Sequence, residues 1–200
     1  EGLAIAYNNL GQLLRDQGEL EPAETHFRDS LLLTRSLRMN FHSATSFIGL
    51  AQVLIYLGRL DEAGEQLEFG RVLAQGLNAP DLLAERNFAE AELKIALRDF
   101  SQAEAIARQA ETLTNASGNV VIQSAALRLI AQCRMELGDL EEARQILDRA
   151  RQAAASGAGD LETGRVNALA VRLYHQVGDQ VEAERCYLAA KEIFVKLNAK

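Results

Sequence analysis

The sequence predicts an all-α fold, a right-handed superhelical α-solenoid of five helix-turn-helix repeats, and three observations support this prediction. Related six-residue strings recur every 40 residues without an insertion, from GELEPA at position 18 to GDQVEA at position 178. An unbroken row of alanines runs through these strings: Ala23, Ala63, Ala103, Ala143 and Ala183. The chain also has only two prolines and no tryptophan, a composition that favours helix over sheet.

Each 40-residue unit is predicted to form two helices joined by a short turn. Glycine adopts the left-handed conformation that often ends a helix, and it occupies this turn in four units, at Gly18, Gly58, Gly138 and Gly178. Arg98 replaces it in the third unit, where we expect backbone strain. The predicted helices span 2–17 and 21–38, 42–57 and 61–76, 81–97 and 101–115, 119–137 and 141–155, and 161–177 and 181–198.

Two further rows of small residues indicate where the paired helices cross: Gly11, Ala51, Ala91, Ala131 and Val171, and Ser30, Gly70, Ala110, Ala150 and Ala190. Larger side chains such as Leu10 and Phe27 are expected to fill the remaining core, whereas Ala79 and Ala158 in the connectors are expected to tolerate enlargement. Ser101 and Glu104 have the spacing of a capping box at a helix start.

Composition limits the classes of partner. Lys and Arg number 21 against 28 Asp and Glu, which leaves a net charge of −7 and makes direct binding to nucleic acid improbable. No apolar run approaches the roughly 20 residues that a membrane helix requires, so no membrane partner is predicted. Cys133 and Cys186 stand too far apart for a zinc or redox pair, which favours free thiols in a reducing cytoplasm.

The sequence contains no motif that would predict an enzyme, a cofactor or a metal site. There is no phosphate-binding loop, no His-Glu-x-x-His pair and no Gly-x-Ser-x-Gly nucleophile turn. Gly157, Gly159 and Gly164 only superficially resemble a dinucleotide loop, because Glu162 stands where the third glycine belongs. We therefore predict a non-catalytic chain; a catalytic site assembled across several units is the alternative.

The first unit resembles the tetratricopeptide repeat. It carries Tyr7-x-x-Leu10-Gly11-x-x-Leu14 followed by Ala23-x-x-x-Phe27, and the resemblance extends through all five units. The period is 40 residues rather than 34, and no proline follows the second helix. In period, the chain is similar to Pins-type repeat arrays and to the repeat domains of bacterial signal-transduction activators of the maltose-activator type.

This resemblance implies one repeat array over residues 1–200, with units of approximately 1–40, 41–80, 81–118, 119–158 and 159–200. Because the chain begins with Glu1 rather than Met, we expect it to be a fragment of a longer protein. The resemblance also implies a concave groove lined by the first helix of each unit. The groove residues would be Asn8, Gln12, Arg15, Ile48, Gln52, Ile55, Tyr56, Phe88, Glu92, Arg128, Gln132, Arg172 and His175.

Two interpretations of this polar row remain open. The row can be a solvated surface of good helix formers, or its amides can hydrogen-bond an extended peptide above an apolar floor. The leading hypothesis is a scaffold that binds a protein or peptide in the groove. The alternative is a sensor domain of a larger bacterial signalling ATPase or transcriptional regulator, which binds a small effector and controls oligomerisation.

The last predicted helix is unusually apolar. We expect residues near Tyr187, Phe194 and Leu197 to contact another chain, or to continue the array into a further repeat. In the alternative, the helix tilts inward and covers its own apolar side chains.

Overall fold

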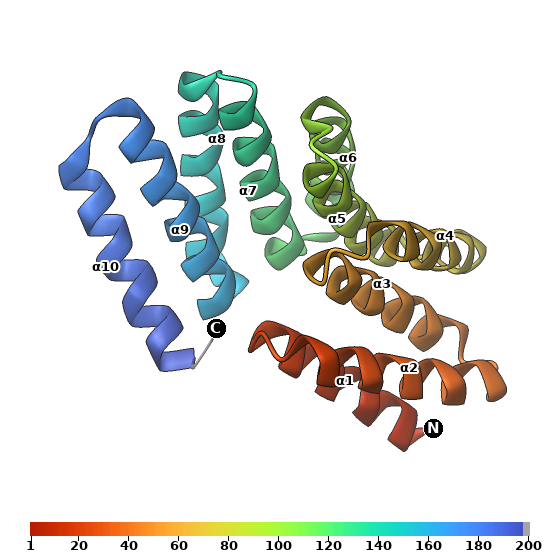
Figure 1. Cartoon of the computed structure of the whole chain (residues 1–200). Coiled ribbons are helices and arrows are strands. Elements are labelled where there is room, and N and C mark those ends of the chain that lie inside the picture. The colour runs from red at the N-terminus through yellow and green to blue at the C-terminus, as the bar shows by residue number, and fades with distance from the viewer. Residues whose placement is uncertain (198–200) are drawn as a thin grey trace. The chain divides into compact units, whose positions relative to one another are not determined.

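The computed structural model describes the backbone of residues 1–197 and, apart from residue 116, their side chains; the predicted helix end at residue 198 lies outside the described residues. Within this range there are ten α-helices and a single π-helical turn (Figure 1). The other predicted helix ends agree with the structure to within two residues. The elements are α1 (Gly2–Asp16), α2 (Leu20–Ser36), α3 (Asn40–Tyr56), α4 (Leu60–Gly76), α5 (Pro80–Ala96), α6 (Phe100–Ser117), α7 (Val120–Glu136), α8 (Leu140–Ala153), η1 (Ala154–Ala158), α9 (Asp160–Val177) and α10 (Gln180–Leu197).

The chain divides into two compact units, Glu1–Arg98 and Asp99–Lys200, called unit 1 and unit 2 below. The 40-residue units of the sequence are called repeats from here on. In unit 1, α1 pairs with α2 and α3 with α4, while α3 also packs against α1, α2 and α5. In unit 2, each helix from α6 to α10 packs against its neighbour in the chain (Figure 1). Each unit is thus all-α in its described part, as predicted, with five packed helices; the predicted pairing of helix 81–97 with helix 101–115 joins the two units and stays a prediction. The continuity of a single array over residues 1–200 stays a prediction.

A residue in the left-handed conformation separates successive helices at intervals of 20 residues. Glycine fills most of these positions, for example Gly58 with φ 76°. Arg98 has φ 62°, which confirms the backbone strain expected where arginine replaces glycine. Two further turns are occupied by Arg38 with φ 55° and Asn78 with φ 50°. Because side chains with a Cβ are disfavoured in this conformation, the turn geometry is imposed by the packing of the helices on either side.

Small side chains lie where the helices of a pair cross. Ala23, Ala63 and Ala143 are fully buried, and the ring of Phe27 is fully buried as well. The predicted core position of Leu10 is wrong, since this side chain is 38% exposed. Leu10 lies on α1, where no earlier helix among the described residues covers its outer face. The alanine row is therefore the feature that brings paired helices close together.

The predicted capping box at Ser101 and Glu104 is also wrong. The N-cap of α6 is Asp99, whose Oδ1 accepts a hydrogen bond from the Gln102 backbone amide at 3.1 Å. Glu104 instead pairs with arginines on α6 and α7. In unit 2 the same side-chain cap recurs at Asn119, Asp139 and Asp179.

Enlarging a row alanine should separate a helix pair. We expect Ala63→Leu or Ala143→Leu to lower the free energy of unfolding by roughly 1–3 kcal/mol, because the added methylenes have no space between packed backbones. Thermal unfolding of these variants and of Ala105→Leu, at an exposed position of α6, measures the effect. Ala158 is unsuitable as the tolerant control, because it is only 8% exposed. Equal losses at row and exposed positions would contradict the packing.

Candidate binding surfaces

Polar side chains from α1, α3 and α5, the first helices of the first three repeats, form a continuous hydrogen-bonded row. Arg15 Nη1 on α1 donates to Gln52 Oε1 on α3 at 2.5 Å. Gln52 Nε2 in turn donates to Glu92 Oε2 on α5 at 2.8 Å. Tyr56 Oη, also on α3, donates to Glu92 Oε1 at 3.1 Å. The structure therefore brings four of the predicted groove residues together, and we call Arg15, Gln52, Tyr56 and Glu92 the unit 1 polar row.

The apolar residues predicted to form the groove floor are almost completely enclosed. Ile48 is 4% exposed, Ile55 is 8% exposed and Phe88 is 6% exposed. Ile48 and Ile55 belong to the hydrophobic core of unit 1, so they stabilise the helix packing rather than offering a large open surface. Gln12 is half-buried on α1, one turn before Arg15.

Asn8, another predicted groove residue, takes part in a buried polar cluster. It is 5% exposed, and its Oδ1 accepts a hydrogen bond from Ser46 Oγ at 3.0 Å. Ser30 Oγ lies 2.9 Å from Ser46 Oγ and donates to the carbonyl of Ala4 at 2.9 Å. These contacts join α1, α2 and α3, so Asn8 satisfies buried hydrogen-bonding groups between helices.

Glu85 on α5 lies near the unit 1 polar row and was missed in the sequence analysis. Burial raises the pKa of its carboxyl, while the nearby charge of Arg15 lowers it and Asp81 raises it. The signal that could have identified it is its position two helical turns before Glu92, which places both carboxyls on one face of α5.

The raised pKa of Glu85 makes the stability of unit 1 depend on pH. A carboxyl whose pKa is higher in the folded state contributes most stability below its unfolded pKa of about 4.3, and this contribution is lost as the pH rises through the folded pKa. Because glutamine does not ionise, we expect Glu85→Gln to raise the melting temperature at pH 7.5 and to have little effect at pH 4. Exposed Glu65→Gln is the control. A melting-temperature difference that is the same at both pH values would contradict the burial of this carboxyl.

In unit 2 the predicted groove residues form ion pairs between α7 and α9. Arg128 Nε donates to Glu162 Oε1 at 2.7 Å, with side-chain exposures of 11% and 6%. Arg172 pairs with Glu136 at 2.7 Å in a much more exposed setting. Gln132 is half-buried on α7 and His175 is exposed on α9. Arg128 is thus held by a buried carboxylate, whereas Arg172 and His175 are accessible.

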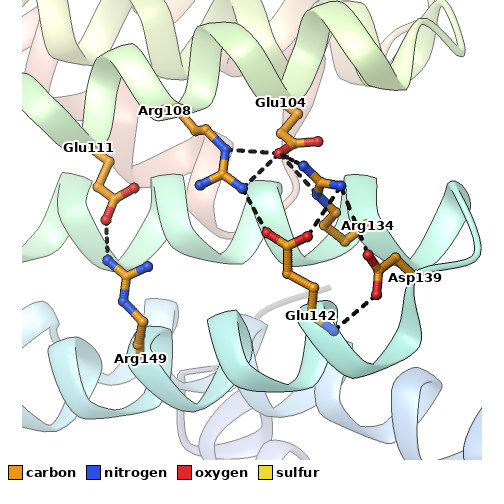
Figure 2. A network of polar contacts seen from close by, with 7 residues as sticks. All are labelled: Glu104, Arg108, Glu111, Arg134, Asp139, Glu142 and Arg149. Carbon is orange, nitrogen blue, oxygen red and sulfur yellow. Dashed lines mark hydrogen bonds and ion pairs between the residues drawn. The ribbon is translucent and has the colours of Figure 1, made fainter.

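A second charged network in unit 2 connects α6, α7 and α8 (Figure 2). Its centre is Glu104 Oε1, which accepts hydrogen bonds from Arg108 at 2.8 Å and from Arg134 at 2.6 Å. Both arginines also reach Glu142 on α8, at 3.1 and 3.2 Å. The network therefore links consecutive repeats through side chains and is satisfied internally.

The C-terminal helix leaves part of its apolar surface uncovered. Tyr187 is 47% exposed, and the more exposed Val195 reaches 72%. Phe194 and Leu197 are half-buried, and the ring of Phe194 packs over Gly164 on α9. Tyr187, Phe194 and Val195 border a groove of about 590 Å³ between α9 and α10. The helix covers only part of its apolar side, so its outer face stays available for contact.

The two cysteines are free thiols, and neither is exposed. Burial raises the pKa of Cys133 to about 12, which makes its thiol a poor nucleophile at neutral pH. Among residues 1–197, no three His, Cys, Asp or Glu side chains gather in a way that could hold a metal ion. In the same range, no helix combines the length and hydrophobicity needed to span a bilayer.

Comparison with known proteins agrees with the repeat architecture. Residues 2–68 match the family model described as tetratricopeptide repeat. A thermophilic TPR protein of Thermus thermophilus aligns with a TM-score of 0.72 at 20% identity, over 97% of this chain and 96% of that one. No curated protein sequence matches this chain.

Two other solved structures are similar in fold and longer than this chain. A Rap protein complexed with competence and sporulation factor aligns with a TM-score of 0.83 at 13% identity, over 96% of this chain and 53% of that one. A signal transduction ATPase with a tetratricopeptide repeat sensor, from Pyrococcus horikoshii, has a TM-score of 0.72 at 13% identity, over 97% of this chain and 30% of that one. The chain is thus all-α with a fold similar to that of tetratricopeptide repeat proteins, and the family model matches residues 2–68.

Proposed function

We propose that this chain is a non-catalytic scaffold that binds an extended peptide, or a segment of a partner protein, along the first helices of its repeats. The observation that carries the proposal is the unit 1 polar row, which joins guanidinium, amide, phenol and carboxylate groups across α1, α3 and α5. Tyr56 is 43% exposed, whereas Gln52 at the centre of the row is 8% exposed. The hydrogen bonds within this row can be replaced by hydrogen bonds to a peptide backbone. The Rap protein, similar in fold, was crystallised with competence and sporulation factor, and this supports use of the fold for ligand binding.

The test begins with a random peptide library selected on the immobilised chain. Fluorescence anisotropy then gives the affinity of a selected peptide for the parent, for Gln52→Ala in unit 1 and for Gln132→Ala in unit 2. We expect a loss of about 0.5–1.5 kcal/mol in binding free energy in the variant whose unit holds the peptide, because one hydrogen bond is removed. Gln109→Ala with Gln152→Ala, at exposed positions of second helices, is the control. Unchanged affinity in both first-helix variants would move the site to another face.

A second proposal is that the array is the sensor domain of a larger signalling ATPase or transcriptional regulator. The specific observation in its favour is the similarity in fold to the sensor-bearing ATPase, over 97% of this chain. A small effector would then replace the peptide, and the array would control oligomerisation. A phosphate-binding loop encoded upstream or a helix-turn-helix encoded downstream would favour this function over the free-standing scaffold.

We also propose that α10 contacts a second copy of the chain or a further repeat. Phe27, Leu67 and Leu147 occupy the register of Tyr187 in other repeats, and each is at most 2% exposed, against 47% for Tyr187. The next first helix packs over α2, α4 and α8, and an equivalent helix would cover α10. We further propose that the chain binds neither nucleic acid nor membrane and lies in the cytoplasm. The net charge of −7 speaks against binding to nucleic acid, and the two free thiols favour the cytoplasm.

Light scattering at increasing concentration tests self-association through α10. We expect a dimer that Phe194→Glu or Val195→Glu dissociates, since either carboxylate would be placed in the apolar groove. Val181→Glu is the matched control, because Val181 lies on the same helix, is 83% exposed and does not border the groove. A parent that stays monomeric at all concentrations would contradict self-association.

A further inference from the structure

Unit 2 contains a cavity where η1 meets α8, α9 and α10. Its volume is about 380 Å³, in the range of roughly 300–1,000 Å³ found for small-molecule sites. Its apolar lining comes from Ala154 and Ala155 on η1, Val166 on α9 and Ala189 on α10. The polar lining includes Arg151, Asn167 and Arg185, and the thiol of Cys186 lies at the same wall.

The backbone at this cavity departs from the repeat. The 20-residue spacing would place one left-handed residue at position 158, but the chain has two, Gly157 with φ 130° and Gly159 with φ 87°. Between α8 and α9 it forms the π-helical turn η1, whereas the other helices end in tight turns. Gly157, with ψ 22°, has non-helical angles inside this turn, so the backbone is kinked beside the cavity.

Side-chain volumes depart from the repeat at the same place. Asn167 occupies a position held by Tyr7, Phe47 and Leu127 in three of the other four repeats. Cys186 is smaller than all four of its register equivalents, two of which are isoleucines. Leu127 is 2% exposed and Phe47 is 7% exposed, so a large residue at this register fills the interior, whereas Tyr7 and the remaining equivalent, Asn87, are half-buried. The hollow in unit 2 therefore arises from smaller residues at core positions.

The electrostatic character of the lining is cationic. Arg151 and Arg185 are its charged residues, and no carboxylate lines the cavity. Arg151 Nη2 lies 2.6 Å from Cys186 Sγ, and Arg151 Nη1 lies 3.8 Å from Glu182, which also pairs with Arg185. Each guanidinium has five N–H donors, so a single shared carboxylate leaves donors for a ligand. An anionic group with a short apolar tail matches this combination of cationic and apolar walls.

We propose that this cavity binds a small organic carboxylate, with the carboxylate group between Arg151 and Arg185 and the hydrocarbon part against η1 and Val166. The Asn167 side-chain amide would donate a further hydrogen bond to the carboxylate. This inference does not depend on peptide binding by the first helices, because neither the unit 1 polar row nor Gln132 lines the cavity.

Titration of the whole chain with hexanoate, followed by ¹H–¹⁵N correlation spectra, tests the proposal. We expect saturable shifts of the backbone amides of Thr163, Asn167 and Cys186. Hexanol has the same chain without the charge, and inorganic phosphate has charge without the chain, so each should bind at least tenfold more weakly. Equal affinity for hexanol, equal affinity for phosphate, or hexanoate shifts confined to residues outside the cavity would each overturn the proposal.

Two variants separate binding from folding. Asn167→Leu fills the hollow with the side chain found at Leu127, so it should fold and lose hexanoate binding. Arg185→Gln, at a side chain that is 72% exposed, should weaken hexanoate about tenfold without lowering the melting temperature. Arg144→Gln, at an exposed position of α8 outside the cavity, should leave the affinity unchanged. Full affinity in a folded Asn167→Leu variant would exclude the cavity as the site.

Discussion

Gly49→Ala is expected to lower the free energy of unfolding of unit 1 by about 3 kcal/mol, at the upper end of the usual cost of overpacking. Gly49 lies in the middle of α3, opposite the fully buried ring of Phe27 on α2. A Cβ at this position would lie 2.5 Å from Cζ of Phe27, and closer still to its Cε1. Neither the ring nor the helix can move without opening the core. Chemical denaturation with urea measures the change.

The matched control is Gly64→Ala on α4, in the same unit. There the new Cβ would meet Leu93 Cδ2 at 3.8 Å, an ordinary van der Waals contact. Because alanine is favoured over glycine within a helix by about 1 kcal/mol, Gly64→Ala should stabilise the protein. The two substitutions are chemically identical, so opposite signs would show that the contact with Phe27 is the cause. A neutral result at Gly49 would contradict the close approach of α2 and α3.

Glu162→Ala is expected to lower the stability of unit 2 by about 3 kcal/mol, because it removes one partner of a buried ion pair. The Arg128 guanidinium would then lose its carboxylate at a site where its side chain is only 11% exposed. Thermal unfolding, followed by circular dichroism, measures this loss. The expected cost comes chiefly from removing the Glu162 carboxylate beside a buried guanidinium, so replacing both residues by apolar side chains should cost much less.

Glu136→Ala provides the comparison for this ion pair. Glu136 and Arg172 also join α7 to α9 with a distance of 2.7 Å, but the Arg172 side chain is 50% exposed. Exposed ion pairs typically contribute at most about 1 kcal/mol, so this variant should be close to the parent in stability. Similar losses for Glu136→Ala and Glu162→Ala would show that burial does not determine the effect.

The helical architecture was largely predictable because its determinants are local and periodic. A small residue every 40 positions sets where helices cross, and glycine or its substitutes set where they end. The capping box at Ser101 failed for a physical reason: Asp99 reaches the free amides of the first turn, while two arginines attract Glu104. The division at Arg98 depends on which residues contact one another in space, and no local sequence pattern reveals that.

The candidate site was only partly predictable. The repeat register placed Arg15, Gln52 and Glu92 on adjacent first helices, and these side chains form hydrogen bonds. The same register assigned Asn8 and Ile48 to the groove, although both are buried by neighbouring helices. Register identifies the helix and the approximate face, but the depth of a side chain depends on the sizes of residues on other helices.

The polar contacts between repeats have a consequence for how such a gene can evolve by duplication and shuffling. Tyr56 with Glu92, and Glu136 with Arg172, occupy the same pair of register positions, but the acidic partner is on the later repeat in unit 1 and on the earlier repeat in unit 2. A recombinant that placed Glu136 before Glu92 would bring two carboxylates together. The repeats share a period, but the charges at these two register positions are not interchangeable between unit 1 and unit 2.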